Sequence, residues 1–228
     1  MFAIRAAERG ADRETEGGAR SLEWQPTLFG GDGVAGCIDR LDLDGTSWVD
    51  HAPAWLCGAD ALFDHFLASL AWEQRQRAMY DDIVWEPRLT ASMTPGSAPP
   101  RVRAITSSLG RLYGARFDRM WLNLYRDGAD SVAWHGDRIQ REVLEPMVAI
   151  VSLGATRTFA LRLRGGGPAV RLAASHGDLI VMGGRCQHDW EHCVPKTRRT
   201  VGPRISFTAR HSRPAASDRP CPEVGTPP

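Results

Sequence analysis

Two kinds of metal-binding side chain occur close together in the C-terminal half of the chain. His135-Gly136-Asp137 places an imidazole and a carboxylate two residues apart, and His192 follows far downstream. In an extended segment, residues two apart point to the same side, so His135 and Asp137 can face one metal ion. Two histidines and one carboxylate, with open positions opposite, suit a mononuclear non-haem Fe(II) centre. A single His-x-Asp is common by chance, so the site depends on the third ligand.

The third ligand is a choice between two histidines. His188 and His192 are four residues apart, and they could bind one metal together if their segment were helical. The sequence from Asp189 to Pro195 instead reads as a strand that leads to a proline. We therefore take His192 as the ligand and place His188 at the rim of the site or behind the ligands.

A second group of polar side chains lies on the last predicted strand. Arg204, Ser206 and Arg210 share one face by two-residue alternation. Arginines directed into a protein interior are costly unless they meet anions, and a dicarboxylate would satisfy both guanidinium groups. The alternative is a pair of exposed arginines on an edge strand. Asn123 and Tyr125, two residues apart on an earlier strand, can face the same cavity as hydrogen-bond donors.

The predicted secondary structure that positions these residues changes near residue 119. Before it, the spacing of leucine and phenylalanine predicts a helix over 59–76, and a second helix begins at prolines 99–100. The segment between them, 85–98, is rich in proline, serine and threonine, and we expect an irregular substrate lid. From 119 onward, alternating patterns between turns predict the strands of a sandwich or barrel. These strands are predicted at 119–126, 147–153, 157–163, 169–174, 178–182, 190–194 and 204–210.

Composition places the chain among ordinary globular proteins. Its 228 residues are 43% hydrophobic and 24% charged, which is enough for one domain with a sizeable core. The net charge of +1 excludes a global basic field that would indicate nucleic-acid binding. Five scattered cysteines without a C-x-x-C pair indicate a reducing cytoplasm. We expect a cytoplasmic monomer with no membrane segment, in which a disordered leader (1–21) and tail (211–228) flank a single domain (22–210).

Several ordered motifs resemble the AlkB family of Fe(II)- and 2-oxoglutarate-dependent dioxygenases. The motifs are N-L-Y-R-D-G-A-D-S-V-A-W-H-G-D, V-S-L-G-A-T-R-T-F, H-G-D-L-I-V-M-G-G, D-W-E-H-C-V-P-K and P-R-I-S-F-T-A-R, in order over roughly residues 119–210. The resemblance implies an α+β fold with a double-stranded β-helix (jelly-roll) core and supporting N-terminal helices. It implies Fe(II), the co-substrate 2-oxoglutarate and O2 as cofactors. It also implies an alkylated, single-stranded or damaged nucleic acid as the partner.

The resemblance also gives each site residue a role. The metal ligands would be His135, Asp137 and His192, which supports His192 over His188; Arg210 joins them as a catalytic residue. The residues around 2-oxoglutarate would be Arg204 and Tyr125 at the distal carboxylate, and Arg210, Asn123 and Ser206 at the end that chelates iron. The implied reaction yields succinate and CO2, hydroxylates an alkyl carbon on a base such as N1-methyladenine or N3-methylcytosine, and releases formaldehyde.

Substrate recognition is where the chain departs from the family pattern. Many members carry an acidic residue two positions after the iron-binding aspartate, where this chain has Ile139. The lid lacks an aromatic residue that many relatives stack on a base, which leaves Met93 or Trp85 as the platform. Trp134 and Arg138, which flank the His-x-Asp tripeptide, are further candidate substrate contacts. The alternatives are an oxygenase of the same fold that acts on a protein, lipid or small molecule, and a non-catalytic metal-binding module.

Overall fold

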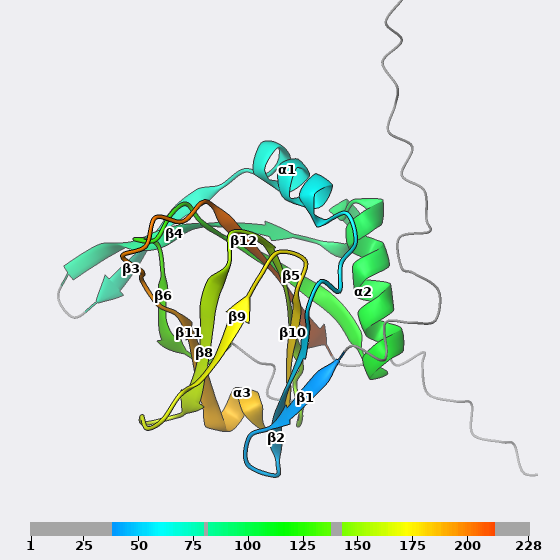
Figure 1. Cartoon of the computed structure of the whole chain (residues 1–228). Helices are drawn as coiled ribbons and strands as arrows, with labels where there is room; N and C mark the ends of the chain where they lie inside the picture. The colour runs from blue at the N-terminus through cyan, green and yellow to red at the C-terminus, as the bar shows by residue number, and fades with distance from the viewer. Residues whose placement is uncertain (1–37, 80–81, 138–142, 213–228) are drawn as a thin grey trace, which may run out of the picture.

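The computed structural model of the chain describes residues 38–79, 82–137 and 143–212. The predicted leader, most of the predicted tail, Arg138 and Ile139 lie outside these residues. The described strands form two sheets (Figure 1), and every strand pair in them is antiparallel. Among the described residues, no helix combines the length and the apolar character needed to cross a membrane.

The larger sheet has eight strands in the order β1-β2-β10-β7-β12-β5-β4-β3. Its strands are β1 (Asp39–Asp42), β2 (Ser47–Ala52), β3 (Glu73–Met79), β4 (Asp82–Met93), β5 (Arg116–Tyr125), β7 (Val148–Gly154), β10 (Leu179–Gly184) and β12 (Arg204–Ser212). The smaller sheet has four strands in the order β6-β11-β8-β9. Its strands are β6 (Val132–His135), β8 (Arg157–Leu163), β9 (Val170–Ala174) and β11 (Trp190–Val194).

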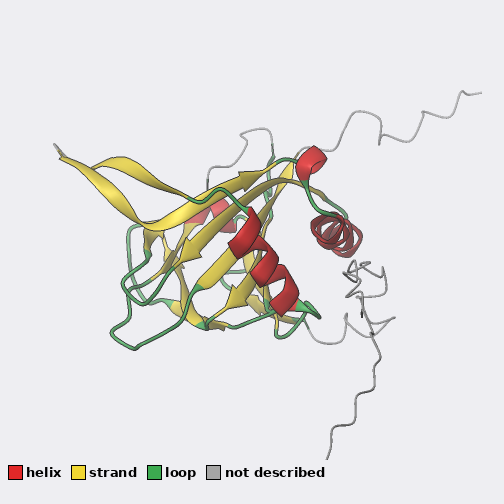
Figure 2. Ribbon diagram, turned by 90° about the horizontal axis from the view of Figure 1, so that it is seen from above, coloured by secondary structure: helices red, strands yellow, loops and turns green. Residues whose placement is uncertain are grey.

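Each face of the larger sheet is covered by a different layer. Helices α1 (Ala59–Ser69) and α2 (Pro100–Tyr113) pack on one face, where Phe66, Ile105 and Phe207 belong to one buried cluster. The smaller sheet packs on the other face, where Phe159 and Ile180 belong to a second buried cluster. The short helix α3 (Cys186–Asp189) connects β10 to β11. Two antiparallel sheets face to face, with helices behind the larger one, form the predicted double-stranded β-helix (Figures 1 and 2).

The strands predicted from residue 119 onward are all confirmed within a few residues. Helix 59–76 was predicted too long, because α1 ends at Ser69 and Leu70 is already extended. The carbonyl of Phe66 accepts both from the backbone amide of Leu70 (3.3 Å) and from the indole of Trp72 (3.3 Å) at this helix end. The following residues pair with β4 as strand β3, so tertiary pairing overrides the helix propensity of this charged stretch.

The segment 85–98 was wrongly expected to be irregular. Its first nine residues belong to β4, and the 3-10 turn η2 (Pro95–Ser97) follows. Pro87 lies inside this strand and has no backbone N–H to donate to the ladder. Its carbonyl accepts from the backbone amide of Ser131 (2.7 Å). Strands β3 and β4 extend together as a hairpin beyond the body of the molecule (Figure 2). A lid function for this hairpin stays a prediction.

Candidate functional site

The three predicted metal ligands converge between the two sheets. His135 on β6 and His192 on β11 are direct cross-strand partners, with ring centroids 4.4 Å apart. Nε2 of His192 lies 3.7 Å from Oδ2 of Asp137. One ligand atom from each of the three residues falls within 4.8 Å of the other two, and the side chains of His192 and Asp137 are buried. Two separate segments therefore build a compact N,N,O donor set.

Hydrogen bonding orients the His135 ring for metal binding. Its Nδ1 lies 2.9 Å from the carbonyl of Ala133, which can only accept. Nδ1 must therefore carry a proton, which leaves Nε2 as the nitrogen that can bind a metal. Metal-binding histidines usually donate their second ring N–H to a carbonyl or carboxylate in this way, which fixes the tautomer and the ring orientation.

Burial and charge keep the other two ligands in the protonation state that a metal needs. Burial lowers the pKa of His192 to about 4, although the carboxylate of Asp137 opposes this shift. Burial alone would raise the pKa of Asp137, but its interactions with His192 and with the guanidinium of Arg210 outweigh burial and lower that pKa. A neutral imidazole and an ionised carboxylate are the ligating forms of these side chains.

Arg210 contacts the ligand set directly. Its Nε donates to Oδ1 of Asp137 at 3.1 Å, and its Nη2 forms an ion pair with the same oxygen. Oδ2 of Asp137 is the oxygen that faces His192. Arg210 therefore holds one carboxylate oxygen and leaves the other for a metal.

Arg204 is a fully buried guanidinium with unused donors. The residue is 1% exposed, and its Nε donates to Oγ of Ser152 at 2.9 Å. Neither Nη1 nor Nη2 has a hydrogen-bond partner among the described residues, and burial lowers its pKa. Its Cζ lies 5.3 Å from the ring centroid of the buried Tyr125. A buried cation with two open N–H groups fits a carboxylate that is supplied by a ligand.

The polar strand face predicted from alternation is present. Arg204 pairs in register with Tyr125, and Ser206 pairs with Asn123. Nδ2 of Asn123 donates to Oγ of Ser206 at 3.3 Å, while its Oδ1 accepts from Nε of Arg88 at 3.0 Å. Asn123 and Ser206 thus lie on the face of the larger sheet that carries Arg204 and, further along β12, the ligand contact Arg210.

Two predicted substrate contacts, Met93 and Trp134, point away from the ligands. Met93 was proposed as a base platform, but it packs against the helix-side cluster, so it lies on the opposite face of β4 from Thr90 and Ser92. Trp134 follows strand alternation away from its neighbour His135, and the guanidinium of Arg162 lies 4.1 Å from its ring centroid. Neither side chain is brought to the ligands.

His188 is not part of the group of possible metal ligands; its position at the rim of the site or behind the ligands stays a prediction. Its Nε2 lies 3.0 Å from the carbonyl of Leu144 and donates to it, because that oxygen can only accept. It belongs to α3 rather than to the strand that carries His192. Arg138 lies outside the described residues, so its predicted substrate contact stays a prediction.

Three further residues of the site were not found from the sequence. Ser152, which binds Arg204, is a buried polar residue in the otherwise apolar strand β7, and that interruption was a usable signal. Arg88, which binds Asn123, carried no such signal. Arg164 packs over Gly136, between the first two ligands. This contact joins residues 28 positions apart and depends on tertiary structure alone.

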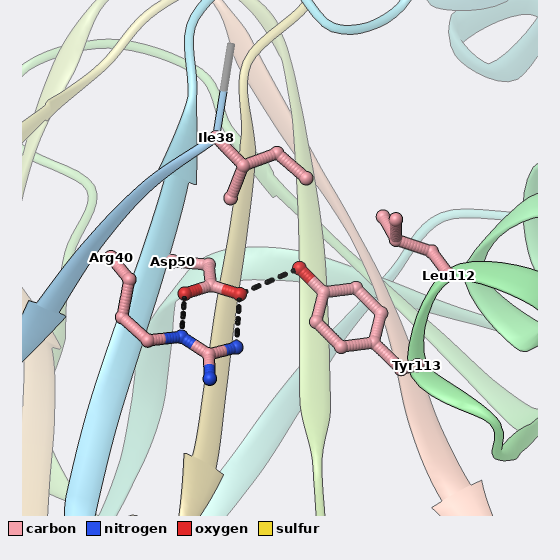
Figure 3. A pocket seen from close by; sticks show the side chains of 5 residues that line it. All are labelled: Ile38, Arg40, Asp50, Leu112 and Tyr113. Atoms are coloured by element: carbon pink, nitrogen blue, oxygen red, sulfur yellow. Dashed lines mark hydrogen bonds and ion pairs between the residues drawn. The ribbon is translucent and has the colours of Figure 1, made fainter. Parts of the chain in front are cut away.

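A pocket on the helix-covered side of the larger sheet does not compete with this site. The pocket measures about 270 Å³ (Figure 3). The carboxylate of Asp50 accepts from Nε (2.7 Å) and Nη2 (2.8 Å) of Arg40 and from the hydroxyl of Tyr113 (3.0 Å). These groups satisfy one another, and burial raises the pKa of Tyr113 above its ordinary value. The pocket thus lacks the unpaired polar groups that mark the region of Arg204.

Comparison with known proteins places the chain in a family. A family model described as the 2OG-Fe(II) oxygenase superfamily matches residues 63–210. The chain belongs to this superfamily. Membership implies Fe(II), 2-oxoglutarate and O2 as cofactors, and the His-Asp-His group together with the unpaired donors of Arg204 fits the first two.

Relatives of this oxygenase include AlkB-type proteins. It is 31% identical to the human "Alpha-ketoglutarate-dependent dioxygenase alkB homolog 3", over 67% of this chain and 61% of that protein. It is 29% identical to the "DNA oxidative demethylase ALKBH2" of Arabidopsis thaliana, over 65% of this chain and 60% of that protein. The chain therefore spans about three fifths of the length of these relatives. The resemblance to the AlkB family is confirmed.

Solved structures share the fold of this oxygenase. A 2OG-Fe(II) oxygenase family protein from Burkholderia pseudomallei matches with a TM-score of 0.53 and 18% identity, over 72% of this chain and 84% of that chain. The structure described as OsALKBH1 matches with a TM-score of 0.55 and 13% identity, over 76% of this chain and all of that chain. Both support the double-stranded β-helix.

Proposed function

We propose that this oxygenase is an Fe(II)- and 2-oxoglutarate-dependent dioxygenase that removes alkyl groups from the bases of DNA or RNA. The observation that carries the dioxygenase activity is the unpaired, buried guanidinium of Arg204 on the sheet face that also carries Arg210, the partner of the His-Asp-His group. A relative named as a DNA oxidative demethylase supports the nucleic-acid substrate. We further propose that the protein acts as a monomer in the cytoplasm.

His135, Asp137 and His192 hold the metal in this proposal. When bound, Fe(II) with 2-oxoglutarate supplies the oxidation of a C–H bond by O2. Arg210 fixes the Asp137 carboxylate through Oδ1, so Oδ2 and the two imidazoles would be the groups that hold the metal. The ring of Phe159, with its centroid 5.3 Å from that of His192, packs apolar surface against the ligands.

Arg204 binds the distal carboxylate of 2-oxoglutarate through Nη1 and Nη2. Ser152 holds Nε, and the ring of Tyr125 lies beside the guanidinium, so the two free N–H groups are oriented before the ligand arrives. Asn123 and Ser206, which lie between Arg204 and Arg210 on the same sheet face, would hold the keto acid end of the co-substrate. Preorganised donors of this kind spare the ligand the cost of ordering them.

The substrate chemistry follows from hydroxylation of an N-alkyl group. The hydroxylated carbon and the ring nitrogen form a hemiaminal, which collapses to formaldehyde and the intact base. A damaged base pairs poorly, so moving it out of the stack and into a pocket costs less than for an intact one. Exposed Lys196, Arg198 and Arg199, in the loop after β11, supply positive charge for the phosphate backbone.

The test is an incubation with Fe(II), 2-oxoglutarate and single-stranded DNA that carries N1-methyladenine. Formaldehyde released in step with restored adenine is the expected result. Succinate formed without any dependence on nucleic acid would favour an oxygenase for a protein, lipid or small molecule instead. Absence of 2-oxoglutarate turnover with all nucleic acids and with none would overturn the enzyme assignment. Asp137→Ala is the matched inactive control, because it removes one ligand.

A further inference from the structure

The residue between the first two metal ligands, Gly136, leaves space that the side chain of Arg164 occupies. A Cβ atom at Gly136 would overlap Nη2 of Arg164 and would lie 3.1 Å from its Cζ. The φ angle of Gly136 is not positive, so its backbone conformation is open to any L-amino acid. A side chain here would therefore have to displace the guanidinium of Arg164.

Hydrogen bonds hold this guanidinium in place from the other side. Nε of Arg164 donates to the carbonyl of His188 at 2.6 Å, and Nη2 donates to the carbonyl of Gln187 at 3.1 Å. The backbone amide of Arg164 also donates to the carbonyl of Asp189 at 2.9 Å. All three acceptors belong to α3, three to five residues before His192.

Arg164 therefore touches both halves of the ligand set. Its guanidinium lies beside Gly136, between His135 and Asp137. Its N–H groups bind the segment that leads into His192. We propose that Arg164 is a positioning residue that clamps these two segments together and so fixes the geometry of the metal ligands. This inference rests on the proposed assignment of His135, Asp137 and His192 as ligands.

The charge of Arg164 makes the clamp distinguishable from a simple electrostatic effect. A positive group beside a cation site opposes cation binding, so its removal alone should strengthen binding. Loss of a clamp should weaken binding, since partners that orient metal ligands typically contribute about 10–100-fold in affinity. The two explanations predict opposite signs for the same substitution.

The experiment is a titration of the metal-free full chain with Mn(II) and, separately, with Co(II), whose absorption spectrum reports ligand geometry. Arg164→Ala is expected to weaken Mn(II) binding about tenfold or more and to alter the Co(II) spectrum. Arg164→Lys keeps the charge but not the planar fork, so it should resemble the alanine variant. The matched control is Arg111→Ala, which removes an equal charge from an exposed side chain on α2, bonded to Ser108. Wild-type affinity is expected for this control.

A double-substitution cycle tests whether the contact itself matters. Gly136→Ala should weaken Mn(II) binding in the wild-type background, because the new methyl group displaces the guanidinium. The same change should have little further effect in the Arg164→Ala background. Wild-type or tighter binding by Arg164→Ala, or fully additive effects in the cycle, would overturn the clamp. Asp137→Ala separates the two proposals: if it keeps wild-type metal affinity, the ligand assignment itself fails.

Discussion

At the scale of single residues, Arg204 is held in an environment that is unfavourable without a ligand. Its side chain is almost fully buried, and two of its nitrogens have no partner. A buried and incompletely paired charge is destabilising, and similar apolar residues in its place are often neutral or stabilising. Stability therefore does not explain why the fold keeps a charge at this position, whereas ligand binding does.

This leads to a prediction for Arg204→Met. We expect the variant without ligands to melt at the same temperature as the wild type or higher, because an unpaired cation is removed. Addition of 2-oxoglutarate with Mn(II) should raise the melting temperature of the wild type but not that of the variant. Thermal melts with and without 2-oxoglutarate measure both effects. A variant that melts well below the wild type yet still responds to 2-oxoglutarate would contradict the assignment.

His192 gives a prediction about pH in the metal-free protein. Its folded pKa of about 4 lies below the unfolded value of 6.5, so the unfolded state binds more protons between these values and stability is lost as pH falls through this window. For this group alone, the free energy of unfolding should fall by about 2 kcal/mol from about pH 7 to about pH 4.5. His192→Gln should show a correspondingly smaller fall. Urea unfolding with a chelator present measures it, and equal slopes for both proteins would refute the prediction.

At the scale of elements, strand parity decides which residues reach the site. Two-residue alternation was enough to predict that Arg204, Ser206 and Arg210 share a face, and the structure bears this out. The same rule puts Met93 on the helix side, but that conclusion needs the pairing of β4 with β5, which local sequence does not contain. Strands such as β3, whose apolar pattern is weak, exist because a partner strand is available. Nonlocal pairing therefore limits prediction from sequence.

Helix α2 offers a matched pair of leucines for testing the layer behind the larger sheet. Leu109 is fully buried against that sheet, whereas Leu112, three residues later, is 40% exposed. Leu109→Ala should lower the free energy of unfolding by about 2–5 kcal/mol, because it leaves a cavity. Leu112→Ala should change it by less than about 1 kcal/mol. Denaturant unfolding distinguishes them, and equal losses would mean that α2 packs differently.

The β3–β4 hairpin carries exposed apolar side chains that the fold does not use. Trp85 is 58% exposed, and an aromatic ring stacked on a base contributes about 1–3 kcal/mol. If the hairpin acts as a lid, Trp85→Ala should raise the KM for methylated single-stranded DNA about tenfold or more while leaving stability within about 0.5 kcal/mol. The control is Val84→Ala, which alters the neighbouring residue, on the opposite face of the strand. An unchanged KM for Trp85→Ala would exclude the lid function of this residue.

At the scale of the whole molecule, positive and negative charges nearly balance, whereas the loop after β11 is locally basic. A net charge of +1 gives no long-range attraction for a polyanion. The loop after β11 concentrates exposed Lys196, Arg198 and Arg199. Two contacts hold this loop: Thr197 donates to the carbonyl of Gly128 (2.9 Å), and Nη2 of Arg157 donates to the carbonyl of Pro195 (2.8 Å). A basic loop that is anchored next to the strand of His192 can supply attraction where the net charge does not.

The salt dependence of binding tests this loop. Each side chain that contacts a phosphate releases counterions. Arg198→Ala or Arg199→Ala should therefore weaken binding of single-stranded DNA and reduce the slope of log K against log salt by about 0.7. The effect should be the same for all sequences, because phosphate contacts carry no sequence information. Arg171→Ala, which removes an equal charge on the edge strand β9, should keep the wild-type slope. Fluorescence anisotropy over a range of salt concentrations measures it, and equal slopes for all variants would place the phosphate contacts elsewhere.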